Sequence, residues 1–292
     1  MEKYLTKSAD VKKLFSPRPA DSHKYDYGHV LIVAGSLGMT GAAVLTAQAA
    51  LRSGAGLVTV AVPKSLLPIV AAQSREVMTL PLPETKETTL SLAAAEIIIQ
   101  FIQKRKVSVL AIGPGLSTHP KTSKLVKKIL NTISLPCVLD ADGLGAFTAS
   151  RADLKKVKAR LILTPHAGEL ARLLGVATDK IRQEREKFAL NFAKEYQLIC
   201  LLKGHQSLIT DGTKIYLNPT GNPGLATAGS GDVLTGIIAA FLGQGMDLFP
   251  ATYAAAYLHG LAGDLSRDEK TELGIIAGDI IDNIPKALKK VL

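Results

Sequence analysis

A glycine-rich stretch that ends on a single acid is the part of the chain best suited to chemistry. It runs from Asn218 to Asp232, and an apolar run of helical length follows it directly. A loop of small residues that enters a helix points backbone N–H groups into one concave space, where the helix dipole adds positive potential. Gly229, Ser230 and Gly231 leave room for an anion to approach. The stretch therefore predicts a phosphate-binding site.

Asp232 is an unexpected residue at the mouth of such a site, because a carboxylate repels phosphate. Its position makes sense if it acts as a general base that takes a proton from a hydroxyl facing the phosphate. The alternative is an ordinary first-turn acid, which the helix dipole favours. The residue alone leaves both interpretations open.

A second candidate group begins at Thr164, after an apolar run that predicts a strand. Thr164 at the N-cap and Pro165 at the first helical position predict a helix start that puts His166 in the first turn. The dipole disfavours imidazolium there, and a neutral histidine can hydrogen-bond a polar ligand. Glu169, one turn on, can hold a hydrated Mg²⁺ between phosphates. A solvent-facing histidine and a dipole-compensating glutamate are the alternatives.

A third candidate, Lys203 to Ser207, follows another predicted strand. Its lysine and free amides suit the phosphates of a nucleotide, and a generic loop lysine is the alternative. A further strand end carries Asp140 and Asp142, to which no role is assigned. His259, within an apolar helical stretch, is interpreted as a packed histidine.

A glycine turn at 35–41 links a predicted strand to an Ala-rich helix. Ala42 stands where a Walker P-loop needs lysine, and the glycines do not follow the dinucleotide-binding G-x-G-x-x-G spacing. Small residues here let a bulky ligand lie against the backbone. A tight strand-to-helix turn with close packing is the alternative.

Short apolar runs alternate with helical segments along most of the chain. Predicted strands cover 29–34, 57–62, 107–112, 137–140, 160–163, 197–202, 206–210 and 213–217, and predicted helices cover 42–52, 90–104, 121–131, 179–196 and most of the chain from 232 onward. Residues 1–27 suggest a helix followed by a loop. The pattern predicts a three-layer α/β fold with a mostly parallel central sheet flanked by helices. Asp211 and Gly212 predict a hairpin with antiparallel strands at one edge. Ligands of such folds bind beyond the carboxyl ends of the strands, where all the turns above lie.

Composition narrows the class of protein. Of 292 residues, 47% are hydrophobic and 21% charged, which favours a large core, expected as one domain over 1–292. The net charge is +10, but the lysines are scattered along the chain and no aromatic residues are interleaved with them, so no nucleic-acid partner is expected. Cys137 and Cys200 are interpreted as reduced core thiols. With no signal-like start and no apolar run of membrane-spanning length, a cytoplasmic enzyme is expected.

Together these segments resemble the ADP- or ATP-dependent NAD(P)H-hydrate dehydratases, a branch of the ribokinase-like superfamily. The resemblance extends from about Tyr27 to Leu288. The blocks that carry it are Gly35–Ala43 with Leu51–Gly56, Gly113–Leu116, Thr164–Glu169, Lys203–Gly204, Asn218–Gly224 and Gly229–Asp232. No single block is specific, but their order along the chain is.

The resemblance implies a reaction and its participants. Hydrated NADH and NADPH (NADHX and NADPHX) would be phosphorylated on the ring hydroxyl by ADP or ATP with Mg²⁺, and loss of phosphate would restore the dihydronicotinamide. Such an enzyme is a lyase. The implied contacts to the hydrate are Ala43, Gly115, His166 and Asp232, with Asp232 as base. Those to the nucleotide are Lys203, Gly204, His205, Gln206, Ser207 and Gly231. Glu169 falls where related enzymes carry a glutamate tied to Mg²⁺.

Departures from the family pattern are small: Leu225, Ala228 and Ser230 replace common Met, Gly and Thr. Because only 28 residues precede the first predicted strand, the NAD(P)H-hydrate epimerase is expected as a separate chain. The resemblance further implies a preference for ADP and a homo-oligomer, a tetramer.

Two other functions compete with this interpretation. A small-molecule kinase of the same superfamily, acting on a vitamin-precursor alcohol, would share the anion site and Asp232, but is expected to lack the 218–224 block. A catalytically silent nucleotide-binding protein is the other, and the retention of Asp232 with Gly229 and Gly231 argues against it.

Overall fold

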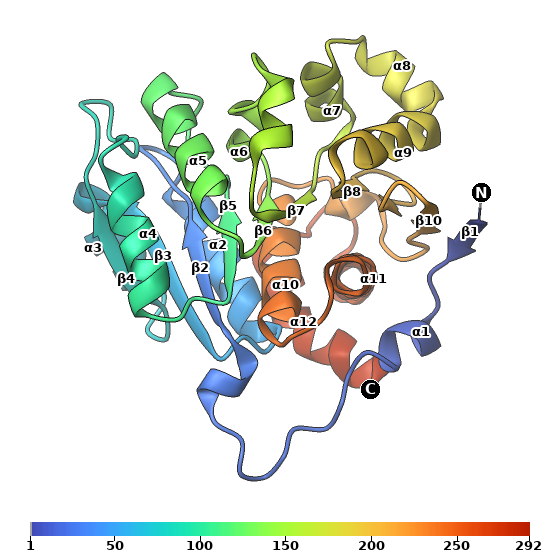
Figure 1. Cartoon of the computed structure of the whole chain (residues 1–292). Helices are drawn as coiled ribbons and strands as arrows, with labels where there is room; N and C mark the ends of the chain where they lie inside the picture. Colours follow the sequence, from blue (N-terminus) through green and yellow to red (C-terminus); the bar gives the residue numbers. More distant parts are fainter. Residues whose placement is uncertain (1) are drawn as a thin grey trace.

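Ten strands form one sheet in the computed structural model, which describes residues 2–292 (Figure 1). The strand order is β1-β10-β9-β8-β7-β6-β5-β2-β3-β4. The strands are β1 (Glu2–Leu5), β2 (His29–Val33), β3 (Leu57–Pro63), β4 (Met78–Leu82), β5 (Val109–Ile112), β6 (Pro136–Leu139), β7 (Arg160–Leu163), β8 (Ile199–Leu202), β9 (Leu208–Thr210) and β10 (Lys214–Leu217). β9 runs antiparallel to both of its neighbours, and every other pair is parallel.

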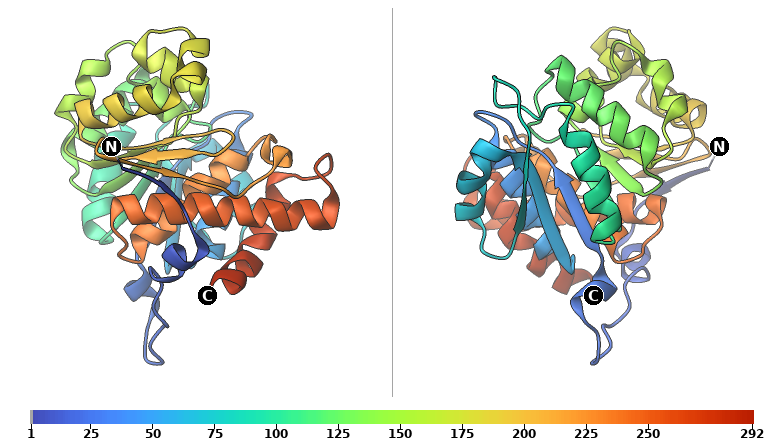
Figure 2. Two further views of the ribbon diagram at one scale, coloured as in Figure 1. Left: turned by 90° about the vertical axis from the view of Figure 1, so that its right-hand side faces the viewer. Right: turned by 60° about the vertical axis from the view of Figure 1, so that its left-hand side comes forward.

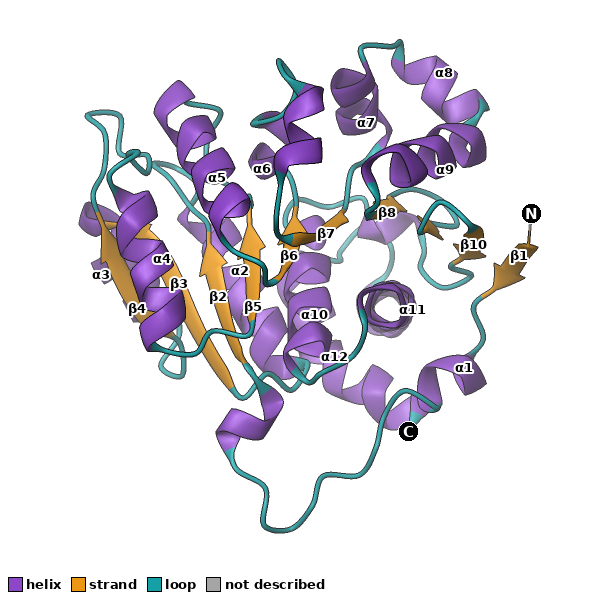
Figure 3. Cartoon of the chain, in the orientation of Figure 1, coloured by secondary structure: helices purple, strands orange, loops and turns teal. Residues whose placement is uncertain are grey.

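The central strands are apolar on both faces because helices cover both sides of the sheet (Figure 3). All five residues of β2 and all four of β5 are buried. The helices are α1 (Ser8–Lys12), α2 (Thr40–Arg52), α3 (Leu67–Gln73), α4 (Ala94–Lys104), α5 (Pro120–Thr132), α6 (Asp142–Gly145), α7 (Ala167–Leu174), α8 (Thr178–Gln183), α9 (Arg185–Tyr196), α10 (Ser230–Gly243), α11 (Leu248–Lys270) and α12 (Ala277–Val291).

Two hydrophobic clusters lie on opposite faces of the sheet. One includes α2, α10, α11 and α12, and the other includes α4, α5, α7 and α9. Figure 1 views α11 nearly along its axis, and the left view of Figure 2 shows its length across the molecule. The predicted three-layer α/β fold with a mostly parallel sheet is therefore confirmed.

Close packing of α10 on α2 fixes the helix that begins at the predicted phosphate site. A Cβ on Gly236 would lie 2.2 Å from the carbonyl oxygen of Thr46 and 2.8 Å from the Cβ of Ala49. Only glycine allows the two helix backbones to approach this closely. The direction of α10, and hence the position of its first turn, depends on this contact.

The hairpin around Asp211 and Gly212 is confirmed as β9 and β10. It does not form the edge of the sheet, because β1 pairs with the outer side of β10. β1 lies in a segment predicted as helix and loop, and β4 was likewise not predicted. Every residue of β1 is exposed, and β4 contains Pro81, so neither strand has the buried apolar pattern of the others.

The long helix predicted over 179–196 is two helices. α8 ends at Gln183 and α9 begins at Arg185, and Glu184 between them has φ −122° and ψ 42°, outside the helical region. Among residues 2–292, no helix has both the length and the apolar character that crossing a membrane requires.

Candidate functional site

The predicted site residues lie on the segments that follow adjacent strands, apart from Gly231 and Asp232, which lie in the first turn of α10. β2, β5, β6, β7 and β8 are neighbours in the sheet and run parallel, so their carboxyl ends share one edge. The loops are linked to one another. Ser36 Oγ donates to the carbonyl of Gly115 at 2.8 Å, and the N–H of Ser117 donates to Asp142 Oδ2 at 2.8 Å.

Asp140 is the buried centre of this edge, with 1% of its surface exposed. Its Oδ1 accepts hydrogen bonds from Lys203 Nζ at 2.8 Å and Thr164 Oγ1 at 2.7 Å, and its Oδ2 accepts one from Thr235 Oγ1 at 3.0 Å. Asp140 therefore joins the loops after β7 and β8 to α10. Its signal in the sequence is a carboxylate directly after a buried strand, but its partners lie 24 to 95 positions away.

Lys203 occupies the space in front of the α10 N-terminus. Its Nζ lies 3.3 Å from where a Cβ on Gly231 would be, so a side chain at Gly231 would push against the ammonium. Burial alone would lower the pKa of Lys203, but the carboxylates of Asp140 and Glu169 outweigh it, and the pKa is raised. A charged lysine thus adds to the positive potential of the helix terminus.

α10 begins at Ser230, two residues before the predicted start at Asp232 and within the last part of the glycine-rich stretch. Gly229 is its N-cap, with a left-handed φ of 86°, and Asp232 is the third helical residue. Burial raises the pKa of the Asp232 carboxyl to about 7, the charge of Asp140 acts in the same direction, and Lys203 opposes them. A carboxyl group that titrates near neutral pH suits a general base.

His166 is the N-cap of α7 and not a first-turn residue, which corrects the predicted helix start at Thr164 and Pro165. Its Nδ1 accepts hydrogen bonds from the N–H groups of Gly168 at 3.0 Å and Glu169 at 3.2 Å. In return, Glu169 Oε2 accepts the N–H of His166 at 2.7 Å, a reciprocal capping arrangement.

The hydrogen bonds of His166 fix the tautomer of its neutral ring. Because Nδ1 accepts two N–H groups, a neutral ring carries its proton on Nε2. Burial lowers the pKa of His166, although Glu169 opposes the shift. The residue is exposed, and its Nε2 lies 3.5 Å from Glu169 Oε1.

The loop from Lys203 to Ser207 presents exposed residues next to the lysine. Gly204, His205 and Gln206 are exposed, and Ser207 Oγ donates to the carbonyl of Gly204 at 3.1 Å. The loop is joined to the His166 segment, because the N–H of Lys203 donates to the carbonyl of Pro165 at 2.8 Å.

Gly115 lies on the loop after β5, and Ala43 lies in α2, just after the loop that follows β2. Ala43 is buried in the first turns of α2, and Gly115 has φ 60°. A Cβ on Gly115 would lie 2.8 Å from the Cβ of Met39 and 3.1 Å from that of Ala42. The two loops therefore pack backbone to side chain, and Gly115 has no room for a side chain.

The polar side chains of the 218–224 block hold the loop to α11. Asn218 Nδ2 donates to the carbonyl of Ala256 at 3.0 Å, and Asn222 Nδ2 donates to Asp264 Oδ1 at 3.0 Å. His259, also on α11, is 9% exposed as a packed histidine should be, and its Nε2 lies 3.0 Å from the carbonyl of Ser230. α11 thus holds both sides of the loop that leads into α10.

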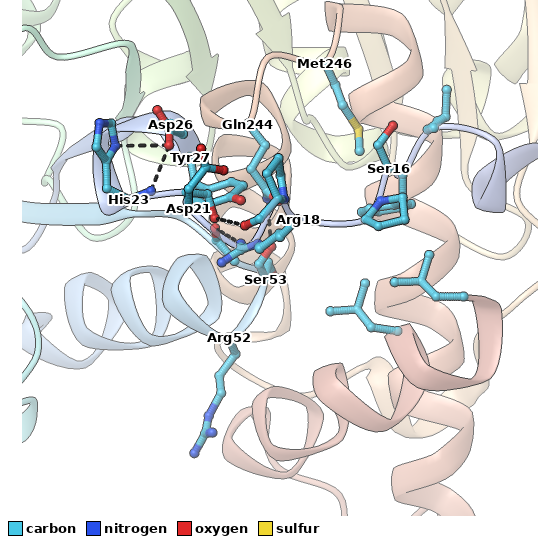
Figure 4. Close-up of a pocket in the computed structure, with 18 residues that line it drawn as sticks. Ser16, Arg18, Asp21, His23, Asp26, Tyr27, Arg52, Ser53, Gln244 and Met246 are labelled. Carbon is cyan, nitrogen blue, oxygen red and sulfur yellow. Dashed lines mark hydrogen bonds and ion pairs between the residues drawn. The ribbon is translucent and has the colours of Figure 1, made fainter.

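A cavity of about 860 Å³ lies elsewhere, between the segment Leu14–Tyr27, Gln244 and the C-terminal helix (Figure 4). Gln244 caps the far end of α10. At 1.5 Å per residue, the twelve residues from Asp232 to Gln244 span about 18 Å. The cavity includes none of the predicted site residues.

The mostly parallel sheet between two helical layers, with a glycine-rich segment at the start of α10, defines a protein of the ribokinase-like class. A family model described as NAD(P)H-hydrate dehydratase matches residues 30–286, and the chain belongs to that family. The family predicted from the sequence blocks is therefore confirmed.

Curated relatives differ in length. The chain is 48% identical over 276 residues to the bifunctional NAD(P)H-hydrate repair enzyme Nnr of Moorella thermoacetica, covering 94% of this chain and 52% of that protein. It thus spans about half the length of the bifunctional relatives. It is also 33% identical to the ADP-dependent (S)-NAD(P)H-hydrate dehydratase of Bacillus subtilis, covering 96% of both chains.

Solved structures agree with this assignment. The ADP/ATP-dependent NAD(P)H-hydrate dehydratase of Bacillus subtilis, co-crystallised with ATP and Mg²⁺, aligns with a TM-score of 0.83 and 30% identity over 99% of both chains. A hydroxyethylthiazole kinase from Pyrococcus horikoshii aligns with a TM-score of 0.59 and 18% identity, which shows a shared fold only.

Proposed function

We propose that the chain is an ADP-dependent (S)-NAD(P)H-hydrate dehydratase, a hydro-lyase that converts hydrated NADH and NADPH back to the reduced coenzymes. The observation that carries the proposal is the meeting of Asp232, Lys203 and Gly231 at the start of α10. A base that titrates near pH 7 there adjoins an ammonium and helix amides, which is what transfer of a phosphoryl group to an alcohol requires. The family assignment supplies the substrate class.

In the first step, the Asp232 carboxylate accepts the proton of the hydrate's ring hydroxyl. The freed oxygen bonds to the terminal phosphorus of ADP, and the bond from that phosphorus to the bridging oxygen breaks, which releases AMP. Lys203 and the N–H groups of the first turn of α10 stabilise the charge on the transferring phosphoryl group.

In the second step, the phosphate ester leaves the ring. The C–O bond breaks with its electrons on phosphate, the ring nitrogen supplies electron density, and loss of a proton from the adjacent carbon forms the ring double bond. The products are NADH or NADPH, AMP and inorganic phosphate. Phosphorylation helps because phosphate is a far better leaving group than hydroxide.

The hydrate is placed against Ala43, Gly115 and His166. In support, the Nδ1 of His166 accepts two backbone N–H groups, so a neutral His166 ring carries an Nε2–H that can donate to the hydrate. The nucleotide is placed on Lys203, Gly204, His205, Gln206, Ser207 and Gly231. In support, Lys203 Nζ lies 3.3 Å from where a Cβ on Gly231 would be, and the rest of this set lies on the loop that follows Lys203.

Glu169 is the residue proposed to hold Mg²⁺. Among residues 2–292, no cluster of three or more His, Cys, Asp or Glu could cage a metal ion. A single carboxylate fits an ion that arrives with the nucleotide and keeps most of its water. Glu169 Oε2 is engaged by the N–H of His166, so Oε1 is the atom left for this contact. When bound, Mg²⁺ would neutralise charge on the nucleotide phosphates.

The proposal has further parts that concern partners. A separate NAD(P)H-hydrate epimerase would supply the (S)-hydrate from its epimer, and the chain would act as a homo-oligomer, a tetramer. The fused architecture of the bifunctional relatives is consistent with a second, linked activity in the same repair process. Size measurement in solution tests the oligomer.

The direct test is an assay with chemically hydrated NADH and NADPH. With ADP and Mg²⁺, absorbance in the reduced-nicotinamide band should return, and AMP and phosphate should appear in equal amounts. Parallel reactions with ATP measure the nucleotide preference. Phosphorylation of a vitamin-precursor alcohol, with no recovery of absorbance from either hydrate, would instead identify a small-molecule kinase.

A further inference from the structure

Arg185, the first residue of α9, contacts the loop assigned to the nucleotide. Its Nη1 donates to the carbonyl of His205 at 2.7 Å, and its Nη2 lies 3.4 Å from the carbonyls of Leu202 and Gln206. One guanidinium thus engages three carbonyls of a single short turn. In the sequence, Arg185 precedes these carbonyls by 17 to 21 positions and lies in a predicted helix, so the sequence alone assigns it no role at the turn.

The turn also packs against the flat guanidinium group. A Cβ on Gly204 would lie 3.3 Å from Arg185 Nη2 and 3.7 Å from its Cζ. Gly204 has φ 148° and Gln206 has φ 49°, so two backbone positions of the turn lie in the left-handed half of the map. Contacts from other elements must stabilise such a turn, because the positive φ of Gln206 is unfavourable for a residue with a side chain.

Arg185 has an unfavourable location by itself. It is half-buried, its charge stands at the positive end of α9, and no ion pair to Arg185 exists within residues 2–292. Surface arginines normally face solvent or a carboxylate, as Arg182 faces Asp179. The three carbonyls are therefore what compensates the cation here.

The orientation of the carbonyls fixes the orientation of the amides. In a trans peptide, the C=O and the following N–H point in opposite directions. Since the carbonyls of His205 and Gln206 face Arg185, the N–H groups of Gln206 and Ser207 face away from it. Neither N–H has a partner among residues 2–292, so both are available to an anion.

We propose that Arg185 is a positioning residue that holds the Lys203–Ser207 turn with its carbonyls inward and its amides toward the phosphates of the nucleotide. The inference deepens the proposed function and rests on its assignment of this loop to the nucleotide. Arg185 touches neither substrate nor the reacting atoms. Its loss should therefore affect nucleotide binding far more than hydrate binding.

The test compares Arg185→Met and Arg185→Lys with the wild type. Methionine keeps an unbranched stem as far as the position of Nε but removes the guanidinium and all its donors, and lysine restores a single cationic donor. The KM for ADP, and its Kd by calorimetry with Mg²⁺ present, should rise about 10- to 100-fold in Arg185→Met and less in Arg185→Lys, the scale of losing charge-assisted hydrogen bonds. The KM for the hydrate should stay within about twofold.

Two further variants make the test specific. Arg182→Met removes an exposed arginine three residues away and should leave both KM values unchanged. Gly204→Ala keeps Arg185 but puts a methyl group against its guanidinium at an unfavourable φ, so it should also weaken ADP binding. It provides the test if Arg185→Met fails to fold.

The outcomes separate the two proposals. If the wild type binds ADP without converting the hydrate to the reduced coenzyme, the proposed function fails, while weaker ADP binding by Arg185→Met still supports the positioning role. If the wild type is active and Arg185→Met binds ADP normally, the positioning role is wrong. Equal losses of affinity for ADP and hydrate would also overturn it, since they indicate a general structural defect. A wild type that binds no nucleotide overturns both.

Discussion

Asp232 combines two properties that a purely structural acid does not need. It is half-buried near a second carboxylate, which holds its pKa near 7, and it stands beside the one lysine that Asp140 fixes in place. An acid that only compensated the helix dipole would gain nothing from this environment. The arrangement instead keeps a proton acceptor ready at physiological pH.

Replacing Asp232 with Asn should separate catalysis from binding. We expect turnover of the hydrate to fall by about 10²–10⁴, the usual contribution of a general base. Nucleotide affinity should stay the same or tighten, because a negative charge near the phosphates is removed. Steady-state kinetics and calorimetry measure the two quantities. An Asn variant with full activity would exclude Asp232 as the base.

The same variant should be more stable than the wild type at alkaline pH. The pKa of Asp232 is raised from an ordinary 3.8 to about 7 in the folded protein. As pH rises from about 4 to 7, the carboxyl ionises in the unfolded chain but stays protonated in the folded one, so the native protein loses stability until the buried group also ionises near pH 7. At pH 8, the free energy of unfolding of Asp232→Asn should therefore exceed that of the wild type by on the order of 1–3 kcal/mol. At pH 3.5, the two proteins should have the same free energy of unfolding. A gain that does not depend on pH would contradict this origin.

The pH dependence of catalysis should report the Asp232 carboxyl. Because the base must be ionised, kcat/KM for the hydrate should rise about tenfold per unit below pH 7 and level off above it. Asp140→Asn removes a like charge and should move the rising limb to lower pH, whereas Lys203→Met removes the opposing cation and should move it to higher pH. Shifts in the same direction in both variants would assign the limb to another group.

At the scale of elements, the contact between α10 and α2 carries a clear prediction. Gly236→Ala places a methyl group 2.2 Å from a backbone oxygen of α2, and the helices must separate. We expect a loss of about 2–4 kcal/mol in the free energy of unfolding, measured by denaturant titration.

Gly41→Ala is the matched control for Gly236→Ala. Gly41 is also helical, but a Cβ there would meet nothing within 4 Å. This change should be neutral or stabilising by up to about 1 kcal/mol, because alanine favours helix more than glycine does. Equal effects of the two substitutions would show that helix propensity, and not the close approach, governs Gly236.

Elements with a buried periodic pattern could be predicted from the sequence, and those without one could not. β2 and β5 are continuous apolar runs, while β1 is wholly exposed and gives no such signal. The predicted start of α7 is wrong by two residues, because the ring of His166 caps the helix in place of the expected Thr164. Capping by a ring nitrogen has no reliable sequence signature.

The site shows the same division. Asp232, Lys203 and Gly231 could be predicted because each stands at a strand end or helix start with unusual neighbours in sequence. The contact of Asp140 joins it to Lys203, which lies 63 positions away in the sequence. The contacts of Arg185 reach residues up to 21 positions away. Only the order of strands in the sheet brings Asp140 next to Lys203, and no local pattern contains that order.

At the scale of the whole molecule, the charge of +10 has a kinetic consequence. Both proposed substrates are polyanions, so long-range attraction should speed their arrival. We expect kcat/KM to fall several-fold between about 20 and 200 mM salt, over which the Debye length shrinks from roughly 20 to 7 Å. Saturating kcat should change much less and serves as the control. A kcat/KM that is independent of salt would show that charge does not steer binding.

The two ends of α10 lie at opposite rims of the sheet, and Leu292 is at the rim that carries the cavity of Figure 4. A sample anchored to a sensor chip through a linker at Leu292 would accordingly have the face proposed to bind the nucleotide turned to the flowing solution. Surface-based measurements of coenzyme repair can thus use a tether that leaves the reactive rim unobstructed.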